Sequence, residues 1–261
     1  MRAWAYFTLV RLYGGVPIVL KAQNGPGDFL VPRSSVEDVY QLVLDDLTFA
    51  IEHLPEEQVE RARVNRWAAK SLRSSVYLTM AGWPLKQDDK YTLALQDAQD
   101  VIQNGPYSLE NEFGNMFLKT NEDTNTEYIW QLKFCGGTDC PGQGLNTPFA
   151  SQATKPQELG GFEDLFIEIA FFNKFPEGAR KDFTFLSYLL TNELDTLSWQ
   201  NFTWQHPFLS KFYDGAVDKT QPYLGQVGST APNADLDFPM LRLAEIMVIY
   251  AEANAMGGGG T

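Results

Sequence analysis

The stretch SSVEDVYQLVLDDLTFAIEHLP, residues 34–55, decides the fold because it holds one complete amphipathic helix. Its apolar residues recur three or four positions apart, which is the period of a helix with a single buried face. These residues are Val36, Val39, Tyr40, Val43, Leu47, Ala50, Ile51 and Leu54. Ser34 followed by Glu37 has the pattern of a capping box, and Pro55 ends the helix.

Helical patterns continue on both sides of this stretch. Residues 2–13 are apolar on nearly all sides and predict a buried helix that ends at a Gly-Gly pair. Residues 65–82 and 89–104 predict two further helices, the first with a stripe of small side chains that lets a neighbour approach closely. A last apolar helix is predicted over 240–256. We therefore expect a mainly α fold of tetratricopeptide-like helix hairpins.

The pattern changes between residues 107 and 239, where Gly, Pro and aromatic residues interrupt any helical period. We expect a strand over 127–134, a short helix over 162–172, an extended segment over 208–213 and loops elsewhere. Long loops in a compact chain are often functional. We expect a single domain, 1–261, whose helical frame comprises 1–106 and 240–256, with residues 107–239 as an inserted ligand-binding region.

The composition narrows the class of partner. The 261 residues carry a formal net charge of −13, 44% are apolar and 13% are aromatic. Such a charge repels phosphate backbones and anionic membranes, so no nucleic acid is expected as a partner. It does not disfavour neutral ligands such as sugars. No stretch approaches the roughly 18–20 apolar residues that span a bilayer.

Metal, cofactor and catalytic signatures are not expected. Four residues lie between Cys135 and Cys140, and either a small disulfide loop or two free thiols fits this spacing. His53 and His206 have no ligand-like spacing to another His or Cys, so no metal site is predicted. The chain also contains no His-Glu-x-x-His, Gly-x-Ser-x-Gly or phosphate-loop motif.

Six segments together resemble the SusD/RagB family in order and spacing, over nearly the whole chain. They include RAWAYFTLVRLYGGVPIV at 2–19, RVNRWAAKSL at 63–72, EYIWQLKF at 127–134 and, as the most specific match, DLDFPMLRLAEIMVIYAEA at 235–253. The other two lie at 31–40 and 94–107. Residue Gly15 stands where the family often has Asp, and Trp83 interrupts the turn after the helix at 65–82.

The resemblance implies the fold of a SusD-like α-α superhelix, and it also implies a function. Proteins of this family are surface-exposed outer-membrane lipoproteins of Bacteroidota-like bacteria that use polysaccharides. Each one works with a SusC-like TonB-dependent transporter and hands it oligosaccharides or peptides, with no catalytic residues and no cofactor. Their lipoprotein signal, first helices and last helix pairs have no counterpart here. The chain is therefore expected to be a fragment lacking both ends, whose membrane contact would be through a lipid anchor absent from it.

A sugar-binding site needs exposed aromatic faces for the C–H side of a ring and amides or carboxylates for its hydroxyls. The segment after Asn192 offers both, and the candidate ligand-binding residues are Trp199, Gln200, Asn201, Trp204 and Gln205. The alternative is that both Trp side chains pack the insertion onto the helices. Glycan, peptide and glycoprotein ligands all remain open.

Two other functions compete with nutrient capture. An all-helical glycoside hydrolase needs two carboxylates about 5–10 Å apart, and 33 acidic residues leave that open. A tetratricopeptide scaffold that binds a peptide is disfavoured, because such proteins stack helix pairs without a long interruption.

Overall fold

The computed structural model describes residues 1–22, 24–25, 29–57, 60, 62–118, 121–134, 156–159, 165–191, 193, 195–210 and 237–258. The two cysteines lie outside these residues. The chain divides into two compact units. The first comprises 1–107, 128–130 and 241–261, and the second comprises 108–127 and 131–240. The expectation that residues 107–239 form a ligand-binding insertion in a single domain stays a prediction.

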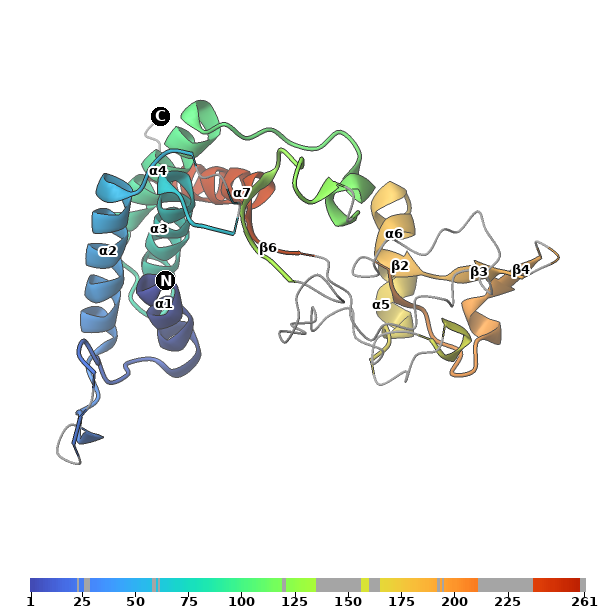
Figure 1. Ribbon diagram of the computed structural model, residues 1–261, viewed down its shortest axis with the longest axis horizontal. Helices are drawn as coiled ribbons and strands as arrows, with labels where there is room; N and C mark the ends of the chain where they lie inside the picture. Colours follow the sequence, from blue (N-terminus) through green and yellow to red (C-terminus); the bar gives the residue numbers. More distant parts are fainter. Residues whose placement is uncertain are drawn as a thin grey trace. The chain divides into compact units, whose positions relative to one another are not determined.

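The described residues of the first unit are mainly α-helical (Figure 1). Their helices are α1 (Arg2–Tyr13), α2 (Val36–His53), α3 (Arg66–Ala81), α4 (Lys90–Asn104) and α7 (Leu243–Ala253). Each of α1 to α4 packs against the next, and α7 packs against α4 and α3. The mainly α fold with helical hairpins that the sequence predicts is confirmed.

Local hydrogen bonds explain where two of these helices begin. The N–H of Asp38 donates to Ser35 Oγ at 3.0 Å, and Ser35 N–H donates back to the Asp38 carboxylate. This capping box lies one residue after the predicted Ser34 and Glu37 pair. Asn65 caps α3 by accepting a hydrogen bond from the N–H of Ala68 at 2.9 Å.

The core of the first unit lies mainly between α1, α2 and α3. Its fully buried members include Val39 and Val43 of α2 and Val76 of α3. Helix α1 contributes Phe7 and Val10, but its outer side, with Leu12, faces solvent. The prediction that α1 is buried nearly all round is wrong, because α2 covers only one of its sides.

The unit boundaries after residues 130 and 240 fall within β strands. Strand β1 (Tyr128–Leu132) pairs with β6 (Phe238–Arg242) in a two-stranded sheet. The sequence predicts the first strand but assigns Met240 to the start of the last helix. That assignment is wrong by three residues, because residues 240–242 pair with β1 and α7 begins only at Leu243.

The second unit is built from short elements around a small aromatic core. They are η2 (Phe113–Phe117), η6 (Gln157–Leu159), α5 (Ile169–Lys174), α6 (Ala179–Thr184), β2 (Phe185–Leu186), β3 (Tyr188–Leu190), β4 (Thr196–Ser198), η7 (Trp199–Asn201) and β5 (Phe208–Leu209). Strand β2 pairs antiparallel with β5, and β3 pairs antiparallel with β4. The predicted short helix over 162–172 is α5, which begins later and ends at Lys174.

The second unit's core is a cluster of four buried residues, Leu186, Leu189, Phe202 and Phe208. Strand register explains two of them, because Leu186 lies opposite Phe208 in the β2–β5 pair. Phe185, also buried, meets the rings of Phe171, Phe172 and Phe175 of the α5 segment edge to face, with centroids 5.1–6.1 Å apart. This packing fixes the ends of the segment that carries the predicted ligand-binding residues.

Candidate ligand-binding site

All five residues predicted to bind a ligand lie in the described stretch that runs from β4 through η7 to β5. Trp199, Gln200 and Asn201 form η7, while Trp204 and Gln205 follow in a turn before β5. Both groups belong to the second unit. The structure thus keeps the predicted residues in one short segment.

Trp204 projects into solvent from a turn whose two flanks are buried. Its side chain is 60% exposed, whereas Phe202 before it is 2% exposed and Phe208 after it is fully buried. The N–H of Gln205 donates to the carbonyl of Phe202 at 3.0 Å and closes the turn. Gln205 has a φ of 54°, in the left-handed region that a glutamine rarely adopts. The indole is therefore presented to solvent from an anchored backbone.

Trp199 is held differently. It is half-buried, packs against the second unit's core and meets the ring of Phe172 edge to face, with centroids 6.0 Å apart. The backbone N–H of Trp199 donates to the carbonyl of Ser187 at 2.9 Å. Part of its indole therefore serves the fold, and only the remaining part can meet a ligand.

The predicted amide side chains are exposed. Gln200, Asn201 and Gln205 all face solvent. Gln200 accepts a hydrogen bond from Ser198 Oγ at 2.7 Å, which fixes one side of its amide. An amide offers both donors and acceptors, so these groups suit the hydroxyl rim of a sugar.

A carboxylate from a distant part of the chain holds the turn on one side. Glu158 of η6 accepts two hydrogen bonds from Thr203, one from its N–H at 2.9 Å and one from its Oγ1 at 3.0 Å. Thr203 immediately precedes Trp204. Sequence reasoning missed Glu158, because 45 residues separate it from its partner and no local pattern links them.

The other side of the turn is held by the segment before α5. The N–H of Ile167 donates to the carbonyl of Pro207 at 2.9 Å, and His206 Nδ1 lies 3.1 Å from the carbonyl of Ile167. The His206 ring lies tilted on Phe166 with centroids 4.2 Å apart. Phe166 is 46% exposed, so it adds a second accessible aromatic ring, in contact with a residue two positions after Trp204. The prediction of Trp-based binding missed it, because Phe166 lies outside the Trp-containing segment.

The charge near this surface is negative. Glu168 accepts a hydrogen bond from the N–H of Phe171 at 2.6 Å at the start of α5. The N–H groups of Phe171 and then Ala170 lower the pKa of Glu168, which keeps it ionised. Together with Glu158, this carboxylate makes the surroundings of the turn more favourable to neutral ligands than to anions.

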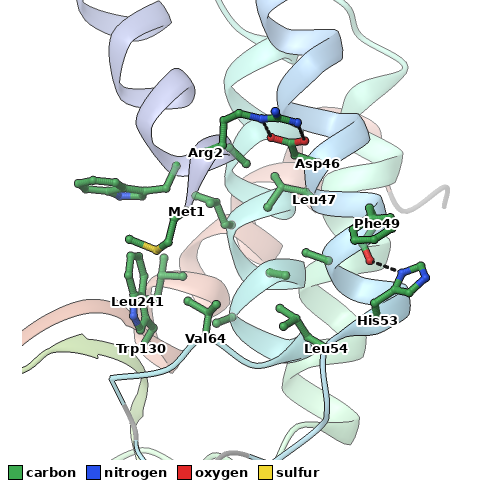
Figure 2. A pocket seen from close by; sticks show the side chains of 16 residues that line it. Met1, Arg2, Asp46, Leu47, Phe49, His53, Leu54, Val64, Trp130 and Leu241 are labelled. Carbon is green, nitrogen blue, oxygen red and sulfur yellow. Dashed lines mark hydrogen bonds and ion pairs between the residues drawn. The ribbon is translucent and has the colours of Figure 1, made fainter. Parts of the chain in front are cut away.

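The first unit contains a separate cavity of about 340 Å³ (Figure 2). Its walls are mostly hydrocarbon and aromatic, with Trp4, Leu72, Trp130 and Leu241 among them. Its polar rim groups are already engaged, because Arg2 pairs with Asp46 at 2.6 Å and His53 Nδ1 lies 2.8 Å from the carbonyl of Phe49. The cavity therefore fits an apolar group better than a hydroxylated one, and none of the predicted binding residues lines it.

Among the described residues, no group of three or more His, Cys, Asp or Glu side chains is arranged to hold a metal ion. None of the helices in that part of the chain has the length and apolar character needed to cross a bilayer.

Comparison with known proteins gives the fold class first. The structure resembles a SusD superfamily protein from Parabacteroides distasonis with a TM-score of 0.78 and 23% identity, over 99% of this chain and 54% of that one. It also resembles a structure described as being with xylogluco-oligosaccharide, with a TM-score of 0.75 and 23% identity, over 97% of this chain and 52% of that one. The fold is that of the SusD superfamily.

Sequence comparison finds the same group of proteins. Residues 1–78 match the sequence model of a SusD-like family described as starch-binding and associating with the outer membrane. SusD-like protein P2 of Formosa agariphila is 26% identical over 275 aligned positions, which cover 99% of this chain and 51% of that protein. The resemblance to SusD/RagB proteins that the sequence motifs indicate is thus confirmed. The chain spans about half the length of P2.

Proposed function

We propose that this protein captures oligosaccharides at the cell surface and passes them to a TonB-dependent outer-membrane transporter without transforming them. The observation that carries the proposal is the exposed indole of Trp204 on an anchored turn, with exposed amides of Gln200, Asn201 and Gln205 nearby in the chain. The match of residues 1–78 to the SusD-like family model supports it, as does the likeness to a structure described with a xylogluco-oligosaccharide.

The physical argument starts from the energy of an exposed indole. A large aromatic side chain in water gains free energy when an apolar surface covers it, and the C–H face of a sugar ring is such a surface. Trp204 needs little ordering before it binds, because both flanks of its turn are already fixed. The amides of the same segment can then bond the hydroxyls at the rim of the ring.

The ligand class we favour is a neutral oligosaccharide. The chain has a formal net charge of −13, and Glu158 and Glu168 lie near the turn that carries Trp204. An acidic oligosaccharide would be repelled from such a surface, whereas a neutral one would not. Trp199 and Trp204 both belong to the proposed site, with Trp204 contributing more because more of its indole is accessible.

Delivery to a transporter and an outer-membrane location are proposed from the family. The SusC-like partner would be a TonB-dependent barrel, and a lipid anchor would hold the whole protein at the surface. Co-purification of such a transporter with the tagged protein from outer membranes tests this part. Recovery of the protein without any transporter, under conditions that preserve membrane complexes, would contradict it.

Calorimetric titration with xylogluco-oligosaccharide and a panel of other neutral oligosaccharides tests capture itself. We expect saturable binding of at least one of them, and binding of none would contradict the proposal. Chromatography of the bound ligand after long incubation separates capture from the glycoside hydrolase alternative. We expect the oligosaccharide to be recovered at its original length, and shortened products would favour the hydrolase.

A further inference from the structure

The turn that carries Trp204 is fixed by a carboxylate that has no other hydrogen bond among the described residues. Glu158 Oε1 accepts both Thr203 bonds, while Oε2 is buried and has no hydrogen-bond partner there. The backbone around Glu158 is itself anchored. Pro156 is buried, the N–H of Leu159 donates to the Pro156 carbonyl at 3.0 Å, and Leu159 packs on the second unit's core.

This arrangement is not required to satisfy the turn. Thr203 is exposed, so water could receive both of its donors in place of Glu158. Glu158 instead fixes the position of Thr203, because its two hydrogen bonds hold both the backbone and the side-chain rotamer of that residue. A charged acceptor makes each of them stronger than a bond between neutral groups. The residue that Thr203 orients directly is the exposed Trp204.

We propose that Glu158 is a positioning residue for ligand binding, which presets the turn so that Trp204 meets the ligand without first being ordered. The inference rests on the proposed function of Trp204. Fixing a binding residue in advance lowers the entropy lost on binding, so removal of Glu158 weakens affinity without removing a ligand contact.

Paired substitutions at Glu158 separate position from charge. Glu158→Ala removes the acceptor, and we expect it to weaken oligosaccharide binding about threefold to tenfold. Glu158→Gln keeps a carbonyl oxygen that accepts both Thr203 bonds, so this variant is expected to bind within about twofold of the unaltered protein. Equal weakening in both variants would overturn the proposal, because charge and not position would then matter.

A double-mutant cycle with Trp204→Ala tests whether Glu158 acts through Trp204. We expect Glu158→Ala to cause no further weakening once Trp204 is absent, although it weakens binding when Trp204 is present. A purely structural residue would weaken both proteins alike, so additive losses would overturn the proposal. Thr203→Val, which removes only the Oγ1 donor, provides a milder variant if Glu158→Ala folds poorly, and the same non-additivity is expected of it.

Fluorescence gives a readout that does not depend on the ligand. The difference in time-resolved anisotropy between each protein and its Trp204→Ala counterpart isolates the signal of this indole. We expect faster depolarisation of Trp204 in Glu158→Ala than in Glu158→Gln, and equal rates would overturn the proposal. Full binding by Trp204→Ala alone would instead remove the proposed function, while the anisotropy would still show whether Glu158 holds the turn.

Discussion

Arg73 of α3 makes a bidentate ion pair with Asp97 of α4. Its Nε lies 2.7 Å from Oδ2, and its Nη2 lies 2.9 Å from Oδ1. Asp97 is buried, and its hydrogen bond is the largest contribution that raises the pKa of Arg73. Arg73 also donates to Thr48 of α2 at 3.1 Å. One guanidinium thus connects three consecutive helices of the first unit.

We expect Arg73→Ala to lower the free energy of unfolding by about 1–3 kcal/mol, because it leaves Asp97 buried without its cation. Urea denaturation followed by circular dichroism measures this change. Arg63→Ala is the matched control, since the Arg63–Glu60 pair is exposed at both ends. It should change stability by less than about 0.5 kcal/mol. Equal effects of the two variants would contradict this role for Arg73.

Asp237 should give the protein an unusual dependence of stability on pH. Burial raises the pKa of Asp237 above its usual value, and Lys133, 2.7 Å away, offsets this only in part. A carboxyl with a raised pKa binds its proton more tightly in the folded state than in the unfolded state. The stability it contributes is therefore fully present below the ordinary pKa of aspartate and falls as pH rises through the raised pKa.

The difference in unfolding free energy between the unaltered protein and Asp237→Asn isolates this effect. We expect the difference to shift in favour of the unaltered protein as pH falls towards the ordinary aspartate pKa. Asp123→Asn is the control, because Asp123 pairs with the same Lys133 but is exposed. A difference that shifts in the opposite direction on acidification would show that the pKa of Asp237 is lowered in the fold.

The side chain of Phe202 should be needed for the stability of the second unit, whereas that of Phe166 should not. Phe202 is buried beside Phe208, with ring centroids 6.3 Å apart. Phe166 contacts the ring of His206 and is partly exposed to solvent. We expect Phe202→Ala to destabilise the protein by about 3–5 kcal/mol and Phe166→Ala by less than about 1 kcal/mol. Thermal unfolding monitored by tryptophan fluorescence measures both. A larger loss from Phe166→Ala would mean that its ring supports the fold and is not available to a ligand.

The affinity for the ligand should depend little on salt concentration if the ligand is neutral. Because an uncharged oligosaccharide makes no ion pair, its affinity should change by less than about twofold between about 0.05 M and about 0.5 M NaCl. A matched acidic oligosaccharide should bind more weakly at the lower salt concentration, since less screening leaves more repulsion. Titration calorimetry at the two salt concentrations measures both. Affinity for the neutral ligand that falls steeply with salt would contradict the uncharged character of the site.

The helices of the first unit follow from the sequence because their signals are local. The caps at Ser35 and Asn65 and the breaks at Pro55 and Gly105 lie within a residue or two of the observed helix ends. The start of α7 is misplaced because residues 240–242 pair with β1, more than a hundred residues earlier in the chain. No local pattern carries that pairing.

The candidate site is only partly predictable for the same reason. The sequence places Trp204 in a segment without helical period, but its exposure depends on the burial of Phe202 and Pro207. The contact from Glu158 and the ring contact of Phe166 with His206 join segments 45 and 40 residues apart. Composition therefore singles out a candidate ligand-binding segment, and only the packing distinguishes an exposed indole from a half-buried one such as Trp199.

Comparison of Trp204→Ala with Trp83→Ala tests oligosaccharide capture most directly. Both indoles are exposed, at 60% and 79%, but Trp83 lies in the first unit on the turn between α3 and α4. Calorimetric titration with a bound neutral oligosaccharide should show about tenfold to hundredfold weaker binding for Trp204→Ala and an unchanged affinity for Trp83→Ala. Unchanged affinity in Trp204→Ala, with the fold intact by circular dichroism, would contradict a ligand site on this turn.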